Sequence, residues 1–141
     1  AQTGGAVVDA QTVKRMVGRT TEAKTWEFVD ALSNRDAARC VLLRSRMEST
    51  SPYALLAACI TRIREIAIVR SLDERGQIRQ LSQYLKGPDW RYKKHAGYAR
   101  KFTAEELRAA LRSARDTERA MKSGTDPEAA FESWYLSVVA R

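Results

Sequence analysis

The sequence predicts an all-α protein, and three observations support this fold class. Apolar residues recur every three to four positions through most of the chain, as they do on the buried face of a helix. Two dipeptides that typically begin helices, Ser51-Pro52 and Asp126-Pro127, lie between such stretches. No stretch alternates apolar and polar residues for long enough to indicate a strand. We therefore expect a helical bundle of about six to seven helices, preceded by one short helix.

Two helices are expected before residue 34. The first covers residues 8–17, with Asp9 as its N-cap and Gly18 as its end. A polar connector over residues 19–23 follows, and the second helix covers residues 24–33. Its apolar positions have helical spacing and are Trp26, Val29 and Leu32.

The third and fourth helices complete the first half of the chain. The third is expected over residues 36–48, with Asp36 as its N-cap. The fourth covers residues 52–72 and has the widest apolar stripe, so we expect it to be the central helix of the bundle. The residues expected to be buried by the third helix are Ala37, Cys40, Val41, Leu43 and Met47.

The second half of the chain is expected to form four more helices. A short fifth helix covers residues 78–85, and Lys86-Gly87-Pro88 ends it. The sixth, which is basic and aromatic, covers residues 88–101, and the seventh covers residues 104–123. The last follows Asp126-Pro127, and its apolar residues are Phe131, Trp134, Tyr135, Val138 and Val139.

The start of the seventh helix has the most specific local pattern of the chain. Thr103 and Glu106 have the spacing of a capping box, in which each side chain accepts a hydrogen bond from the other residue's backbone N–H. Phe102 and Leu107 have the spacing of a hydrophobic staple. We therefore expect a fixed corner between the sixth and seventh helices, with Leu107 buried.

Length and composition restrict the class of protein. The 141 residues, of which 44% are hydrophobic, suit one soluble domain. No apolar run is long enough to span a membrane, and the N-terminus lacks the pattern of a signal peptide. Cys40 and Cys59 fall on apolar helical faces and are expected to be buried free thiols, as in a reducing cytosol. The single His and two Cys exclude most zinc sites.

The sequence has no residue set that indicates an enzyme. Phosphate-binding loops, nucleophile elbows and zinc motifs are all absent from it. The neighbouring Glu105 and Glu106 are expected to serve the helix start rather than acid–base chemistry. His95 has no obvious carboxylate partner and is expected at the surface. Glu118 and Lys122 have the spacing of a structural ion pair. No catalytic residue, cofactor or metal is expected.

The formal net charge of +8 raises the alternative of a nucleic-acid-binding module. The segment from residue 86 to residue 101 has one acidic residue, Asp89, and three interleaved aromatic ones, Trp90, Tyr92 and Tyr98. Packing of Trp90 and Tyr98 against neighbouring helices is one expectation, and phosphate contact by the basic side chains is the other. The candidate phosphate contacts are Lys86, Arg91, Lys93, Lys94, Arg100 and Lys101.

From Thr12 to Arg141 the sequence resembles a known family. The matching segments, in order, are residues 28–32, 36–39, 52–56, 93–94, 99–111, 118, 122–124, 126–128 and 132. Among these the run Ala99-Arg100-Lys101-Phe102-Thr103-Ala104-Glu105-Glu106-Leu107 is the most specific. The family is that of the delta subunits of bacterial DNA polymerase III, which are components of the sliding-clamp loader. Gly76, Tyr92 and Gly97 depart from the family pattern.

This resemblance implies a division of the chain and a role. Residues 1–23 would be the end of an AAA+-like lid domain with a linker, and residues 24–141 the helical collar. The N-terminal region that grips the clamp would be missing, so the chain resembles a fragment. Collar domains hold the loader together as a ring, and the delta subunit is not an ATPase. The implied protein is a non-catalytic scaffold in bacterial DNA replication, located in the cytoplasm, with other loader subunits as partners, weak DNA contact at most and no membrane.

The last helix is the predicted subunit interface. A ring-forming domain must present faces to its neighbours beyond those its own core needs, and aromatic residues are frequent interface anchors. The candidate interface residues are Trp134, Tyr135 and Val138. We expect at least one of Trp134 and Tyr135 to be substantially exposed.

Overall fold

The computed structural model describes the backbone of residues 10–140 and the side chains of residues 22–140. In this part of the chain all regular structure is helical, which confirms the predicted fold class. The helices are α1 (Ala10–Ser33), α2 (Ala37–Ser45), α3 (Pro52–Glu74), α4 (Leu81–Tyr84), α5 (His95–Ala99), α6 (Ala104–Lys122) and α7 (Pro127–Val139). Short 3₁₀ turns at Ile78–Gln80 and Asp89–Tyr92 flank α4.

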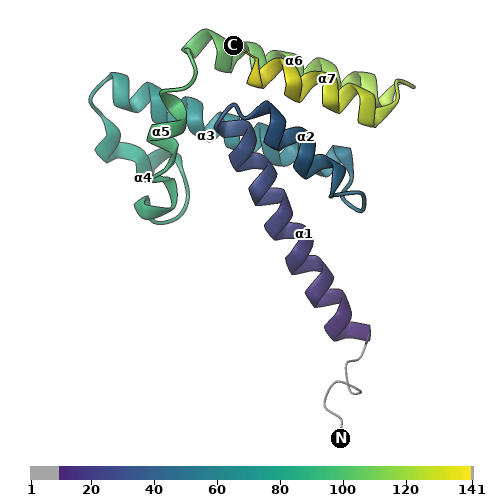
Figure 1. Ribbon diagram of the computed structural model, residues 1–141. Coiled ribbons are helices and arrows are strands. Elements are labelled where there is room, and N and C mark those ends of the chain that lie inside the picture. The colour runs from purple at the N-terminus through teal and green to yellow at the C-terminus, as the bar shows by residue number, and fades with distance from the viewer. Residues whose placement is uncertain (1–9, 141) are drawn as a thin grey trace, which may run out of the picture.

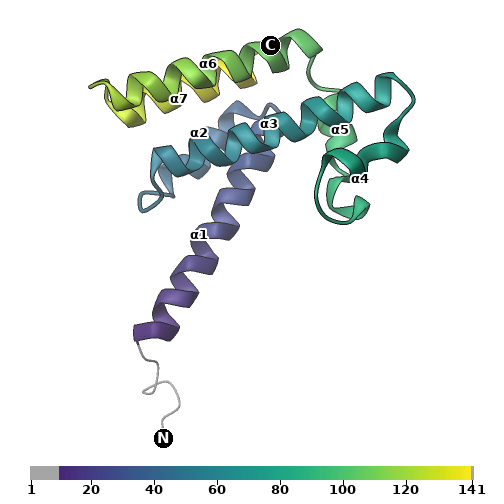
Figure 2. The ribbon, with the colours of Figure 1, turned by 180° about the vertical axis from the view of Figure 1, so that it is seen from behind.

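Helix α3 is the central helix, as predicted, because α1, α5, α6 and α7 all contact it. Ser51 caps its N-terminus by accepting a hydrogen bond from the backbone N–H of Tyr53 at 3.1 Å, and Pro52 occupies the first turn. Helices α6 and α7 pack together along one side of α3, and α4 and α5 lie at its far end (Figures 1 and 2).

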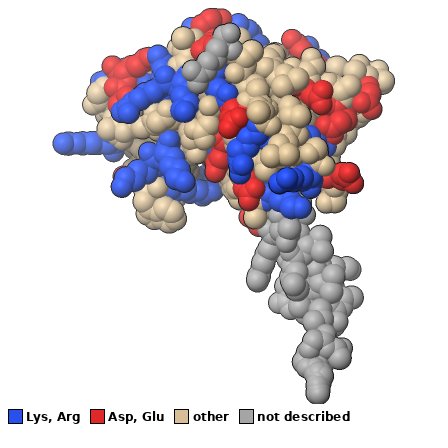
Figure 3. All heavy atoms as spheres, in the orientation of Figure 1, with Lys and Arg blue, Asp and Glu red and all other residues tan. Residues whose placement is uncertain are grey.

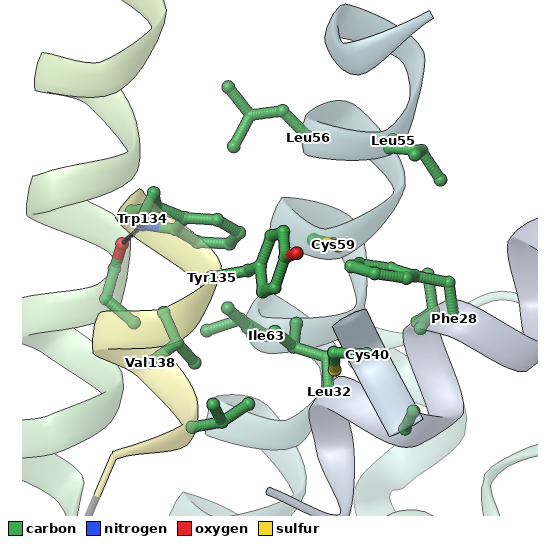
Figure 4. Packing of buried hydrophobic residues seen from close by; sticks show 14 of the residues in the cluster. Phe28, Leu32, Cys40, Leu55, Leu56, Cys59, Ile63, Trp134, Tyr135 and Val138 are labelled. Atoms are coloured by element: carbon green, nitrogen blue, oxygen red, sulfur yellow. Dashed lines mark hydrogen bonds between the residues drawn. The ribbon is translucent and has the colours of Figure 1, made fainter. Parts of the chain in front are cut away.

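The core lies where α1, α3 and α7 meet, and Figure 4 shows residues of all three pointing into it. The rings of Phe28 and Tyr135 meet edge to face with centroids 5.2 Å apart, and Phe131 packs against both. Cys40 and Cys59 are buried free thiols, as predicted. Burial raises the pKa of Cys40 to about 12, so its thiol is protonated and inert at neutral pH.

Residues 10–33 form one continuous helix, so the predicted stop at Gly18 and connector at 19–23 are wrong. A single glycine costs a helix only about 1 kcal/mol relative to alanine, and the polar residues that follow it do not break a helix. The predicted N-cap, Asp9, lies outside the described residues. The turn after α1 is as expected, and it places Arg35 in the left-handed region with φ 57°.

The predicted basic helix over residues 88–101 is also wrong, because two short pieces replace it. Tyr92 is buried in a second small cluster with Val69, Leu72 and Leu81, and its hydroxyl donates to the Lys86 carbonyl. These contacts fold the chain back on itself and favour a turn over a straight helix. We call the segment from residue 75 to residue 94 the α4 lobe.

The corner before α6 is formed as predicted. The Thr103 hydroxyl accepts from the Glu106 N–H at 3.0 Å, and the Glu106 carboxylate accepts from the Thr103 N–H at 2.8 Å. Phe102 and Leu107 are both buried in the main core. The capping box and the burial of Leu107 are therefore confirmed.

Two arginines that the sequence did not single out fix this corner. Arg35 pairs with Glu106 at 2.9 Å and donates to the Lys101 carbonyl at 2.8 Å and to the Ala140 carbonyl. Arg70 donates to the carbonyls of Ala99 at 2.9 Å and Phe102 at 2.7 Å. The Arg35 guanidinium and the Thr103 N–H lower the pKa of Glu106 to about 2.

Candidate subunit-interaction surfaces

The predicted interface residues on α7 are buried, so the expected exposure of Trp134 or Tyr135 is wrong. Trp134 is 3% exposed, Tyr135 1% and Val138 7%. The Trp134 indole N–H donates to the Ala110 carbonyl and to the Ser113 hydroxyl, both at 3.1 Å. Small residues on α6 leave room for the ring, and the α7 side chains fill the core of the bundle (Figure 4).

Helix α2 instead exposes apolar side chains. Cys40 and Leu43 face the core, whereas Val41 is 47% exposed and Leu42 44%. The predicted burial of Val41, and of Ala37, is therefore wrong. Four consecutive apolar residues on a helix cannot all face one side, because neighbours diverge by about 100°. The apolar run over residues 40–43 is the sequence signal that could have revealed this surface.

An ion pair fixes the position of α2 against α7. The side chain of Arg44 pairs with Glu128 and donates to the carbonyls of Met47 at 3.1 Å and Thr50 at 2.9 Å. Its guanidinium also lies over the Phe131 ring. Because this link holds the inner side of α2, its outer residues Val41 and Leu42 stay in a fixed place on the surface. In Figure 3 uncharged surface lies beside acidic and basic side chains near the centre of the view, where α2 lies in Figure 1.

The predicted phosphate contacts are exposed but do not share one helix. They lie in the loop after α4, in a 3₁₀ turn and around α5, and they are Lys86, Arg91, Lys93, Lys94, Arg100 and Lys101. Trp90 is 75% exposed, so its predicted packing against a neighbouring helix is wrong. Tyr98 is buried as predicted, beneath the Arg62 guanidinium and close to Asp30.

His95 is not a surface residue, which corrects the prediction. It is 5% exposed, and its Nε2 lies 3.0 Å from a Glu65 oxygen on α3. Its ring meets Tyr92 edge to face. The contact joins α5 to α3 and holds the α4 lobe to the bundle, so it is structural. The sequence carried no sign of it, because the two residues are thirty positions apart.

The predicted roles of the acidic residues on α6 are largely confirmed. Glu106 closes the capping box, while Glu105 pairs with Arg108 at 3.1 Å and Arg112 at 3.0 Å instead of the helix end. These hydrogen bonds lower the pKa of Glu105. Glu118 and Lys122 form the predicted pair at 3.9 Å. Among residues 22–140, no group of three or more His, Cys, Asp and Glu side chains could hold a metal ion.

The family model described as DNA polymerase III delta subunit, C-terminal domain, matches residues 22–138. The chain belongs to this family. The match covers the helices of the bundle except the N-terminal part of α1 and the last residue of α7, and it confirms the resemblance found in the sequence. A search of curated proteins gives no significant match.

A solved structure of the Bacillus subtilis DNA clamp loader delta protein, YqeN, has a similar fold. It superposes with a TM-score of 0.75 and 24% sequence identity over 93% of this chain. The chain spans 40% of the length of that structure. The two structures therefore share the arrangement of their helices in space.

Within the described residues, no helix is both long and apolar enough to cross a membrane.

Proposed function

We propose that this delta C-terminal domain is a non-catalytic scaffold that joins neighbouring subunits of the sliding-clamp loader in DNA replication. The observation that carries the proposal is the family match over residues 22–138 together with an apolar face on α2. A helix that is apolar on both faces normally has a partner on each of them. The main core covers one face of α2, and a neighbouring loader subunit would cover the other.

The surface on α2 replaces α7 as the proposed subunit contact. Val41 and Leu42 are exposed without any change in the bundle, whereas Trp134 and Tyr135 could reach a partner only if the core opened. Apolar residues at the centre of a subunit contact contribute most of the binding energy when a rim of polar groups surrounds them. Arg39 and Arg46, both exposed, stand at either end of α2 and could supply such a rim.

The proposed role also carries a division of the chain. Residues 24–141 would form the collar, and residues 1–23 would belong to the preceding lid domain, with α1 continuing across the boundary as one helix. The start of the family match at residue 22 supports this boundary. A clamp-loader scaffold would act in the bacterial cytoplasm, where Cys40 and Cys59 are expected to stay reduced, as they are in this structure.

Reconstitution with the other loader subunits tests the proposal. Leu42→Ser should weaken incorporation of the chain into the loader by about tenfold or more, as loss of an interface anchor does. Leu136→Ser, which changes a residue of similar exposure on α7, is the matched control. Both variants should melt close to the wild-type temperature. Wild-type incorporation of the Leu42 variant, or equal loss with the control, would contradict the α2 contact.

DNA contact by the basic residues is the weaker alternative. The six candidate side chains do not share one helix, and two of the three aromatic residues between them, Tyr92 and Tyr98, are buried and cannot stack on bases. A salt titration of binding to labelled single-stranded and duplex DNA tests it. Affinity that falls steeply with salt, and falls further in Lys93→Glu, would favour this alternative over the scaffold.

A further inference from the structure

An apolar groove on the α4 lobe is not accounted for by assembly through α2. It has a volume of about 410 Å³, within the size range of binding pockets. Its floor consists of Val69, Leu81 and Tyr92, all buried, and its walls include Ile78 and Trp90. The α4 lobe lies at the far end of the bundle from the α2–α3 connection (Figures 1 and 2), so the groove is separate from the proposed subunit contact.

Two large apolar side chains in the walls of the groove are exposed to solvent. Trp90 is 75% exposed and Ile78 40%, although both stand beside a cluster that could bury them. The floor beneath them is fixed, because the Tyr92 hydroxyl donates to the Lys86 carbonyl. A preformed groove of this kind binds an apolar side chain without first having to become ordered.

The charge around the groove is strongly positive. Arg79 and Lys93 line its edge, where Asp89 is the acidic residue. The segment from residue 86 to residue 101 carries six basic side chains against that one carboxylate. Figure 3 shows Lys and Arg gathered on the visible face of this end of the molecule. A ligand with carboxylates beside its apolar group would complement both features.

We propose that this groove binds a segment of a partner protein that carries a large apolar side chain flanked by Asp or Glu. The apolar side chain lies against Trp90 and Ile78, over the floor formed by Val69 and Leu81. The flanking carboxylates lie at the edge, where Arg79 and Lys93 stand. Affinity comes from the apolar contact, and the charges select for acidic sequences.

The geometry favours a peptide over single-stranded nucleic acid and over a second copy of the chain. Proteins that bind single strands stack successive bases on several exposed aromatic rings. Here Tyr92 and Tyr98 are buried, and the exposed Tyr84 does not line the groove, so Trp90 is the exposed aromatic ring of the groove. A second copy docked lobe to lobe would oppose two basic surfaces, which repel each other.

Selection from a random peptide library tests the proposal. The library is displayed on phage and selected on the immobilised 141-residue chain, and the enriched peptides are then titrated in solution by fluorescence anisotropy. We expect enriched peptides with an aromatic or Leu residue next to acidic ones. Trp90→Ala should weaken their binding by about tenfold or more, and Lys93→Glu should weaken it and reduce its salt dependence.

Two control variants and two rival ligands make the outcome decisive. Tyr84→Ala removes an exposed aromatic residue of the same lobe outside the groove, and Lys122→Glu changes a charge on α6; both should bind like the wild type. Absence of enrichment, or enrichment without acidic residues, overturns the proposal. So does tighter binding of oligo-dT that depends on Trp90, or self-association that Trp90→Ala abolishes. Circular dichroism shows whether each variant is folded.

Discussion

Arg35 connects three parts of the chain that are distant in sequence. Its side chain is only 4% exposed, and its guanidinium pairs with Glu106, donates to the Lys101 and Ala140 carbonyls and lies 4.8 Å from the centre of the Phe102 ring. Its backbone is in the left-handed region, which costs an L-residue roughly 1–2 kcal/mol. The side-chain contacts therefore outweigh a local backbone penalty that glycine would avoid.

Substitution of Arg35 separates these two contributions. Arg35→Ala and Arg35→Gly both lose the side-chain contacts and should both be less stable than the wild type. The glycine variant should be the more stable of the two by about 1 kcal/mol, after its larger unfolded-state entropy is counted. Urea unfolding of the two variants measures the difference. A less stable glycine variant would show that the turn is not strained.

The ion pair of Glu106 makes the stability of the fold depend on pH. Its pKa is lowered to about 2 from an ordinary value of 4.5, so its contribution is complete above pH 4.5 and is lost as the pH falls toward 2. Glu106→Gln keeps a capping side chain and loses the charge. It should be less stable than the wild type at neutral pH, and the difference should shrink below pH 4.5 in urea titrations.

The control for this experiment is Glu105→Gln. The Glu105 carboxylate is exposed and pairs with surface arginines, so its loss should have a smaller effect at neutral pH. An equal effect of the two substitutions would show that the Arg35 contact contributes nothing beyond a surface pair.

Single-residue burial was the least predictable property of the chain. Trp90 was expected to pack against a neighbouring helix and is exposed, whereas Trp134 and Tyr135, of which at least one was expected to be exposed, are both in the core. Periodicity tells which residues share a face, but not which face meets another helix. The buried position of His95 depends on Glu65, which the fold supplies from a different helix.

At the scale of the element, the start of α6 follows local chemistry closely. Its capping box and the burial of Phe102 and Leu107 were predictable, because each depends on residues within a few positions of one another. The continuous α1 and the divided segment before α6 were not predictable. Helix α1 is continuous because one glycine is too weak to end a helix. The segment before α6 is divided because Tyr92 packs against residues that are distant in the sequence.

Two substitutions measure what the start of α6 contributes. Leu107→Ala should lower the free energy of unfolding by about 2–5 kcal/mol, because Leu107 is 1% exposed in the main core. Thr103→Ala should lower it by about 0.5–2 kcal/mol through loss of the cap. Neither should change the affinity for loader subunits at temperatures where the variants are folded. A melt of Leu107→Ala equal to that of the wild type would contradict its place in the core.

At the scale of the whole molecule, the bundle has two cores of unequal size. Among the described residues, 24 buried hydrophobic residues form the main cluster, whereas the α4 lobe rests on a cluster of four. Regions with few buried apolar contacts open locally without global unfolding. Amide hydrogens of α4 and its flanking 3₁₀ turns should therefore exchange faster than those of α3 and α6. Equal protection in both regions would show that the lobe and the bundle unfold together.

The length of α1 has a mechanical consequence. Its 24 residues extend about 36 Å, and among its described side chains, those of residues 22–33, the buried ones lie from Phe28 to Ser33. Figure 1 shows the rest of the helix projecting away from the other helices. The helix is thus anchored at its C-terminal end in the core and can rotate about that end. A tilt of about ten degrees about the buried end displaces the other end, roughly 27 Å away, by about 5 Å, so a small rotation becomes a large movement there.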